Sequence, residues 1–325
     1  VGNSVLDYLP SEMQLEINRY LDKMTAGDLE RAEFRITVNE PIKRTIRILL
    51  TTVINQQRES IKGIAITIQD ITREVELNEA KSQFISNVSH ELRTPLFNIK
   101  SFIETLHEFG EDLDVEQRQE FLLTVNNETD RLARLVNDVL DLSRLESGRS
   151  YNMDGVDLSQ AIEQTLRTYQ LNARDKGIEL IQDIGANLPL VRGHYDLLLQ
   201  VLGNLIGNAL KFSRTDGKVA LRAYKLNQPN ISKPRVRVEI GDTGIGIPQE
   251  DQAAIFDRFF RVENRVHTLE GTGLGLSIVR NILEDKHHTR VFLISEVGTG
   301  TTFWFDLEIF EETADSEQLT VISEQ

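Results

Sequence analysis

The chain has 325 residues, carries 51 acidic against 36 basic residues for a formal net charge of −15, and contains no cysteine. This length allows about two domains of roughly 150 residues, with a fragment in addition. The acidic surplus argues against a general nucleic-acid or anionic-membrane binder, because phosphate backbones favour basic surfaces. Without cysteine the chain forms neither disulfides nor thiolate metal sites, which fits a reducing compartment.

The sequence contains no stretch of the roughly 18 apolar residues that a membrane helix needs. It starts at Val1 with neither a signal nor a transit peptide. We therefore expect a fragment that is itself soluble, and any membrane attachment would lie in a missing N-terminal segment.

Residues 1–72 predict a small α/β unit. An amphipathic helix from Pro10 to Leu21 comes first, and three β-branched segments that could form an antiparallel meander follow it. A lone meander needs further strands or a partner to bury its face, so this unit looks incomplete at its N-terminus. The three strands are predicted at 34–38, 45–53 and 61–68.

Residues 73–150 predict a helical hairpin, because apolar residues recur every three or four positions in two long segments. The first helix runs from Arg73 to about His107, and the second ends at Ser147. Long uncovered stripes of this kind usually pair again, so a dimeric four-helix bundle is the expected closure. The stripe residues are Ile85, Val88, Leu92, Leu96, Ile99, Ile103 and Leu106, then Leu132, Leu135, Val139 and Leu142.

Residues 151–310 mix helices and strands without strict alternation, which favours an α+β domain over a doubly wound sheet. The acidic residues 311–325 predict a disordered tail. Helices are expected at 158–171 and 195–212, and strands at 177–183, 217–225, 235–241, 289–295 and 301–309.

The first long helix carries a reactive group. His90 and Thr94 share a face roughly opposite the apolar stripe, and Glu91 places a carboxylate beside the imidazole. Neutral imidazole is a competent nucleophile near neutral pH. A zinc site of the H-E-x-x-H type is excluded, because Thr94 stands where the second histidine would be. Taken alone, His-Glu is more often a solvated helix face.

A second group lies in the predicted helix 195–212. Asn204 and Asn208 stand one turn apart, and amide oxygens suit Mg²⁺, which also takes water and phosphate oxygens. Lys211 can reach a phosphate, and Phe212 can cover a base. Two surface or capping asparagines are the plainer interpretation.

A third group follows a predicted strand. The carboxylate of Asp242 can accept a hydrogen bond from an exocyclic amine, which selects adenine over guanine. Gly244 and Gly246 let the backbone approach a ligand. An ordinary glycine-rich turn is the alternative. Between this group and the next, the segment 255–261 reads by itself as an amphipathic helix with core phenylalanines.

The last group is a glycine loop that runs into a helix, where free N–H groups favour phosphate. A Rossmann site lacks its βαβ unit here, and a P-loop lacks its Lys-Ser/Thr. The loop residues are Gly271, Thr272, Gly273, Leu274 and Gly275.

Together these groups resemble the conserved sequence boxes of the sensor histidine kinases, and they occur in the order that the family requires. The resemblance covers about 75–310. It implies that His90 is phosphorylated, that Glu91 assists proton transfer and that Thr94 helps to dephosphorylate the partner. It also implies that Asn204 and Asn208 hold Mg²⁺, that Asp242 contacts adenine and that 261–272 is a mobile lid.

Two departures from the usual pattern do not touch the expected ATP contacts. Gly193-His194 replaces the usual Gly-Asp, and Lys286-His287-His288 replaces His-Gly-Gly. The second departure and its surroundings are similar to the stress-sensing kinases of cyanobacteria and red-lineage plastids. Residues 1–72 resemble the back half of a PAS sensor domain.

The resemblance therefore implies an α+β multidomain chain: a partial PAS unit, a hairpin that forms a dimeric four-helix bundle, and an α/β-sandwich ATP-binding domain of the gyrase and Hsp90 type. The expected activity is autophosphorylation from Mg·ATP and transfer to an aspartate of a response regulator receiver domain, with regulator phosphatase activity. The expected place is the cytoplasmic face of a membrane or a plastid. A chain that acts mainly as a phosphatase and an ATP-sensing scaffold that never phosphorylates are the alternatives.

Overall fold

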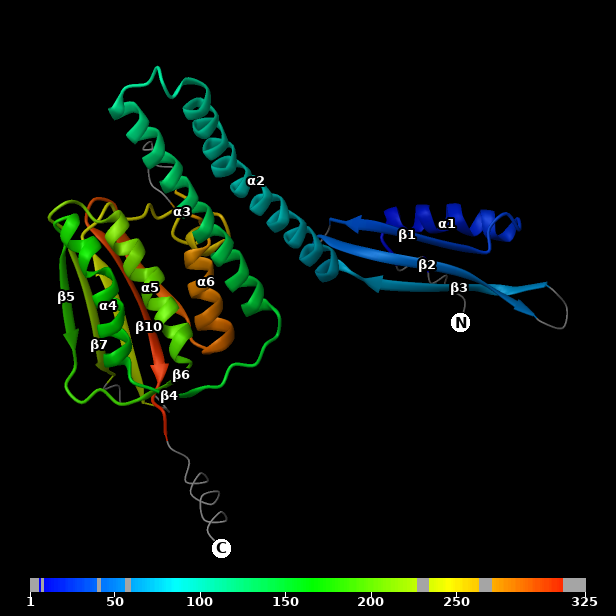
Figure 1. Cartoon of the computed structure of the whole chain (residues 1–325). Helices are drawn as coiled ribbons and strands as arrows, with labels where there is room; N and C mark the ends of the chain where they lie inside the picture. The colour runs from blue at the N-terminus through cyan, green and yellow to red at the C-terminus, as the bar shows by residue number, and fades with distance from the viewer. Residues whose placement is uncertain are drawn as a thin grey trace, which may run out of the picture. The chain divides into compact units, whose positions relative to one another are not determined.

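The computed structural model describes residues 6, 9–39, 42–55, 60–226, 234–262 and 271–311. The chain divides into two compact units, Val1–Asn87 and Val88–Gln325 (Figure 1). Most of the predicted tail and of the predicted lid lies outside the described residues.

The first unit is a helix on a three-stranded antiparallel sheet. Helix α1 (Ser11–Thr25) precedes β1 (Arg31–Val38), β2 (Arg44–Asn55) and β3 (Ser60–Asp70), which pair in the order β1-β2-β3. The predicted helix and meander are thus present. Alternate residues of each strand point to one face, so one apolar row of β2 meets the apolar side of α1. The buried residues of this contact include Met13, Ile17, Met24, Ile48 and Leu50.

Helix α2 (Thr72–Phe109) begins at a side-chain cap. The Asp70 carboxylate accepts hydrogen bonds from the Thr72 main-chain N–H (3.0 Å) and the Thr72 hydroxyl (2.6 Å). The Thr72 hydroxyl in turn accepts one from the Thr45 N–H at 2.9 Å. These bonds satisfy N–H groups that a helix start leaves without partners and join the helix directly to the end of the sheet.

In the second unit, α3 (Val115–Glu146) and the part of α2 from Val88 onward form the predicted hairpin. A capping box at Asp114 and Gln117 starts α3, so the chain turns sharply after α2. Leu135 and Leu142 are buried on the seam, and the rings of Phe102 and Phe121 meet at a centroid distance of 5.1 Å.

The first-helix stripe is only partly covered by α3. Leu96 and Ile103 are 58 and 49% exposed, whereas Leu92 and Ile99 are half-buried. Side chains at spacings of three and four form a broad apolar stripe on the helix surface. A single antiparallel helix covers only part of that stripe. The exposed side chain of Ile103 fits the expected second hairpin of a dimer.

The remainder of the second unit, here called the C-terminal domain, is built on a five-stranded sheet. The strands β5 (Glu179–Ile184), β7 (Lys218–Lys225), β8 (Arg235–Asp242), β10 (Gly300–Glu308) and β9 (Val291–Glu296) lie in the order β5-β7-β8-β10-β9. Only the β5–β7 pair is parallel among these. A small second sheet joins β4 (Asp154–Val156) to β6 (Val191–Gly193).

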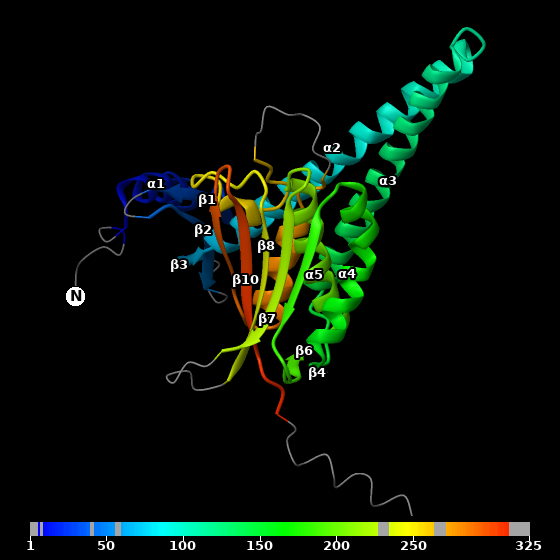
Figure 2. The same ribbon diagram turned by 90° about the vertical axis from the view of Figure 1, so that its left-hand side faces the viewer.

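Helices α4 (Leu158–Asp175), α5 (Tyr195–Phe212) and α6 (Gly275–Asn281) cover one face of this sheet (Figures 1 and 2). A 3₁₀ turn, η2 (Ala254–Phe256), precedes α6, and a π-helical segment, η3 (Ile282–Lys286), continues it. Along β7 and β8, and along β10 from Phe303 onward, the buried residues alternate and are apolar, as expected for a half-covered sheet. The core includes Leu202, Leu205, Leu221, Val238, Ile278 and Phe305.

The two sequence departures noted above meet in this domain. The His194 main-chain N–H donates to His287 Nε2 at 3.2 Å, so the proton of the His287 ring lies on Nδ1, which is 2.9 Å from the Ile282 carbonyl oxygen. The ring of Tyr151 packs edge-on against that of His194, and Lys286 lies over the Tyr151 ring. Neutral His287 thereby joins the start of α5 to the end of η3.

None of the helices in the described parts of the chain combines the length and the apolar character that a membrane crossing requires.

We predict that acid destabilises the C-terminal domain through His287. Burial, and to a lesser extent the neighbouring His194 and His288, lowers the pKa of His287 in the folded state. The unfolded value is about 6.5, so the unfolded chain takes up the proton first, and stability falls as the pH drops through that value. The melting temperature should decrease between pH 7.5 and 5.5, and His287→Gln should flatten this decrease.

The matched control for this prediction is His288→Gln, because His288 is exposed. It should keep most of the pH dependence of the unmodified chain, because burial is the main cause of the lowered His287 pKa. Equal pH dependence in both variants would contradict the role of His287.

Candidate functional site

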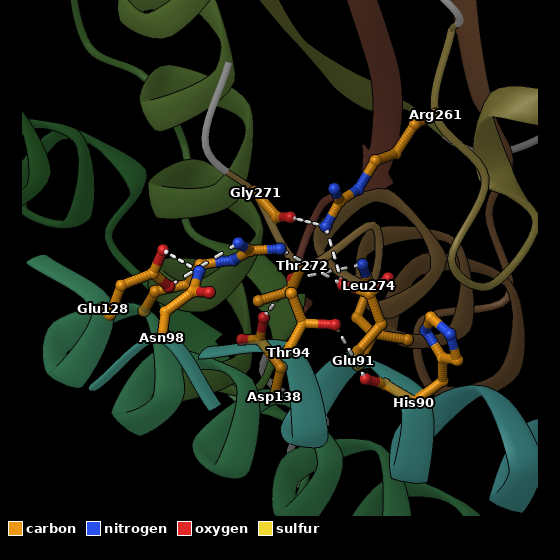
Figure 3. A network of polar contacts seen from close by, with 11 residues as sticks. His90, Glu91, Thr94, Asn98, Glu128, Asp138, Arg261, Gly271, Thr272 and Leu274 are labelled. Atoms are coloured by element: carbon orange, nitrogen blue, oxygen red, sulfur yellow. Dashed lines mark hydrogen bonds and ion pairs between the residues drawn. The ribbon is translucent and has the colours of Figure 1, made fainter. Parts of the chain in front are cut away.

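His90 lies exposed on α2, and its neighbours have defined contacts (Figure 3). The Thr94 hydroxyl donates to the His90 carbonyl oxygen at 3.3 Å, which places both residues on one exposed face. Pro95, the next residue after Thr94, is buried within α2. The phosphoacceptor candidate is thus accessible from solvent.

Glu91 is half-buried and lies between two arginines. Its Oε2 atom accepts a hydrogen bond from Arg131 of α3 at 3.3 Å and one from Arg261 of the C-terminal domain at 3.0 Å. Arg261 also donates to the main-chain oxygen of Gly271. The carboxylate next to His90 is therefore linked to the first residue of the glycine loop.

The predicted asparagine face lies on α5. Asn204 and Asn208 are both half-buried, and their side chains make no hydrogen bond to any other described residue. The Lys211 ammonium lies 4.5 Å from the centroid of the Phe212 ring. A row of polar groups thus runs along one side of the helix toward its C-terminus.

Asp242 ends β8 beside this row. Its Oδ1 accepts from the N–H groups of Gly244 (2.8 Å) and Thr301 (3.3 Å). Burial raises the pKa of this carboxyl, and the two main-chain donors oppose that shift. Among the described residues, the other oxygen of the carboxyl has no such donor.

The turn after Asp242 packs against the end of α5 and against β9. The Ile245 N–H donates to the Phe212 carbonyl oxygen at 3.2 Å. Gly246 has a φ of +71°, and a Cβ atom there would lie 2.0 Å from the Glu296 carbonyl oxygen. Only glycine fits this position.

The glycine loop closes over the same side of α5. A Cβ at Gly271 would lie 2.6 Å from the Lys211 ammonium, and one at Gly275 would lie 3.0 Å from Asn204 Oδ1. Gly273 has a φ of +72° and accepts a hydrogen bond from the Phe259 N–H at 2.9 Å. The four C-terminal boxes of the sequence are therefore brought together around α5.

The glycine loop also contacts the hairpin. The Thr272 hydroxyl donates to Asp138 of α3 at 2.6 Å and accepts from the Leu274 N–H at 3.3 Å. Burial raises the pKa of Asp138, while the Thr272 hydrogen bond acts in the opposite direction. Two further bridges join the same surfaces: Gln200 donates to Asp141 at 2.7 Å, and Arg258 pairs with Glu146.

Three residues of this network were not singled out from the sequence. Arg131 and Asp138 belong to the second hairpin helix, and the sequence marks Arg261 only as the residue where the amphipathic segment 255–261 meets the expected lid 261–272. A signal existed for one of them: Glu128 and Arg131 form a charged pair at spacing three beside the apolar seam. The contacts of Asp138 with Thr272 and of Arg261 with Glu91 each join residues more than a hundred positions apart in the chain.

Two family models match the chain. Residues 80–148 match the His Kinase A (phospho-acceptor) domain. Residues 193–310 match the histidine kinase-, DNA gyrase B-, and HSP90-like ATPase. The two models thus cover most of the hairpin and the C-terminal domain from the end of β6 onward, in the order expected from the sequence.

Three curated relatives align with almost the whole chain. Drug sensory protein A of Synechocystis is 58% identical over 96% of this chain and 50% of its own length. The uncharacterized sensor-like histidine kinase ycf26 of Pyropia yezoensis is 54% identical over 96% and 50%. Sensor protein kinase WalK of Staphylococcus aureus is 33% identical over 94% and 72%. The chain spans about half the length of the first two relatives, which confirm the cyanobacterial and red algal resemblance.

Solved structures agree with the fold. Full-length ShkA, crystallised with AMPPNP, has a TM-score of 0.50 and 32% identity over 70% of this chain and 46% of its own. The histidine kinase ThkA, in complex with the response regulator protein TrrA, has a TM-score of 0.57 over 91% and 83%, but its 22% identity supports the fold alone. With both family models and relatives such as WalK in agreement, the chain belongs to the sensor histidine kinases.

Proposed function

We propose that the chain transfers the γ-phosphoryl group of Mg·ATP to His90 and then to an aspartate of a response regulator receiver domain. The contact of the glycine loop with the His90 segment carries this proposal. Arg261 links the loop to Glu91, and Thr272 links it to Asp138. A nucleotide-site candidate and a nucleophile therefore meet within one unit.

ATP is the proposed donor because the C-terminal domain offers a group for each part of it. The Asp242 oxygen that does not bind Gly244 and Thr301 would accept a hydrogen bond from the exocyclic amine of adenine. Phe212 would cover the base, and Lys211 with the N–H groups of the glycine loop would hold the phosphates. The ATPase family match and AMPPNP in the related ShkA support this choice.

Magnesium fits the asparagine face. Asn208, with Asn204 one turn earlier, supplies neutral amide oxygens without protein hydrogen-bond partners among the described residues. Mg²⁺ usually keeps several waters and binds phosphate oxygens besides one or two protein groups. When bound there, it would neutralise negative charge on the transferring phosphates.

In the first transfer, a ring nitrogen of neutral His90 attacks the γ-phosphorus. The bond from that phosphorus to the bridging oxygen breaks, and ADP leaves with the electron pair. The other ring nitrogen loses its proton, for which Glu91 is the nearest carboxylate in the sequence. In the second transfer, a carboxylate oxygen of the regulator takes the phosphoryl group from the phosphohistidine, and the imidazole takes up a proton again.

Thr94 fits a role in the dephosphorylation of the regulator. It is exposed on the His90 face, and its hydroxyl is occupied only by the long bond to the His90 carbonyl oxygen among the described contacts. The hydroxyl can therefore orient a water toward a phosphoaspartate docked on this face. We include regulator phosphatase activity in the proposed function for this reason.

The partner surfaces follow from exposed apolar residues on the hairpin. Leu96 and Phe97, at 58 and 69% exposure, continue the His90 segment and would contact the receiver domain. Leu122, Leu123 and Leu140 are also largely exposed and would be covered by a second copy of the hairpin. A homodimer that presents two His90 faces is the proposed assembly.

We predict that His90→Gln abolishes acid-labile phosphate on the protein and leaves nucleotide binding unchanged. The side chain is exposed, so its replacement should cost little stability. The measurement combines radiolabelled ATP with calorimetry of AMPPNP binding. His107→Gln is the control, because His107 is exposed on the same helix, and this variant should label normally. Labelling of the His90 variant would defeat the assignment.

We predict that Thr94→Ala keeps autophosphorylation but slows dephosphorylation of the regulator about tenfold or more. The reason is that the variant lacks the hydroxyl that orients the attacking water toward the phosphoaspartate. The decay of phosphorylated regulator is followed with the variant and ADP. Thr105→Ala removes an equivalent bond, from a threonine hydroxyl to the carbonyl four residues earlier, and should decay like the unmodified chain. A normal decay with Thr94→Ala would exclude the role.

We predict that Gly273→Ala weakens AMPPNP binding by tenfold or more. The substitution adds strain at positive φ, roughly 1 kcal/mol, and its Cβ would lie 2.8 Å from Phe259 Cα. Gly148→Ala is the matched control, with a similar φ of +70° and nothing within 4 Å of the new atom. It should lose comparable intrinsic stability but no affinity. Equal affinities in both variants would remove Gly273 from the nucleotide site.

A further inference from the structure

Glu91 belongs to a chain of alternating charges that reaches into the hairpin (Figure 3). Arg131 directs Nη2 to Glu91 at 3.3 Å and Nη1 to Glu128 at 3.7 Å. The other oxygen of Glu128 accepts from the Asn98 amide at 3.1 Å. Arg131 therefore bridges two carboxylates, one of which is fixed to α2 by Asn98.

The inner part of this chain is shielded from water. The side chains of Arg131 and Glu128 are 23 and 18% exposed, whereas that of Arg261 is 42% exposed. The Glu128 oxygen nearest to Arg131 is buried without a hydrogen bond in the described chain. Leaving such a carboxylate without a cation is costly, so Glu128 keeps Arg131 in place.

The position of Glu91 needs such support. Neighbouring residues of a helix diverge by about 100°, so a glutamate directly after a histidine does not face it. The Glu91 side chain is also long and has several rotamers. Arg261 alone would draw the carboxylate toward the C-terminal domain, whereas Arg131 contacts the same oxygen atom from α3.

We infer that Arg131 is a positioning residue for phosphoryl transfer: anchored by Glu128, it fixes the Glu91 carboxylate between His90 and Arg261. This inference rests on the proposed function of His90 and Glu91. The planar fork of arginine can bridge two carboxylates at once, whereas a lysine ammonium is a single point charge. Lysine should therefore replace Arg131 only in part.

The test is a double-mutant cycle on the initial rate of His90 labelling by ATP. Arg131→Gln should lower kcat about tenfold, with KM for ATP unchanged, and Arg131→Lys should recover part of the loss. In a Glu91→Gln background, Arg131→Gln should have no further effect, because its partner is already absent. Arg118→Gln, on the same helix with its Nε bonded to the Asp114 carbonyl oxygen, should label at the normal rate.

A tenfold loss that persists in the Glu91→Gln background, or an unchanged rate for Arg131→Gln alone, would overturn the inference. Should Arg131→Gln fail to fold, Glu128→Gln takes its place in the cycle, since it can keep the bond to Asn98 and loses only the anchor for Arg131. Absence of label on His90 of the unmodified chain would instead refute the proposed function itself.

Discussion

Polar bridges between the hairpin and the C-terminal domain place the two halves of the proposed transfer machinery against each other. They are Glu91–Arg261, Asp138–Thr272, Asp141–Gln200 and Glu146–Arg258. Each lies partly in water, where such contacts contribute only about 0–1 kcal/mol. A surface held this way separates easily, which suits the proposed transfer, in which His90 faces first a nucleotide and then a regulator.

The C-terminal domain does not depend on these bridges for its own fold. Its core residues, such as Leu205 and Phe305, lie between helices and sheet and are fully buried. The candidate nucleotide-site residues lie at the edge of that core. Asp242 is the last residue of β8, and Asn204 and Asn208 lie in the C-terminal half of α5. The proposed repeated transfer requires this arrangement, with rigid support on one side of the site and weak docking on the other.

Much of this arrangement follows from the sequence. The helix 195–212 and the strands 235–241 and 301–309 are predicted within one or two residues, because apolar periodicity and glycine punctuation mark them clearly. Periodicity does not tell which residues of the α2 stripe α3 covers. It identifies the apolar face of a helix but not how the partner helix is rotated against that face. Arg131 and Asp138 stay hidden for the same reason: their roles depend on contacts with other helices and loops.

The contact of Asp138 with Thr272 offers the most direct test of the docked surface, because the chain contains no cysteine. The double variant Asp138→Cys, Thr272→Cys would carry the only two thiols. A short thiol-reactive crosslinker should join them within one chain, which mass spectrometry of the linked peptides detects and a denaturing gel shows as a monomer. Unlinked thiols, or crosslinks only between two chains, would contradict the docking of the glycine loop on its own hairpin.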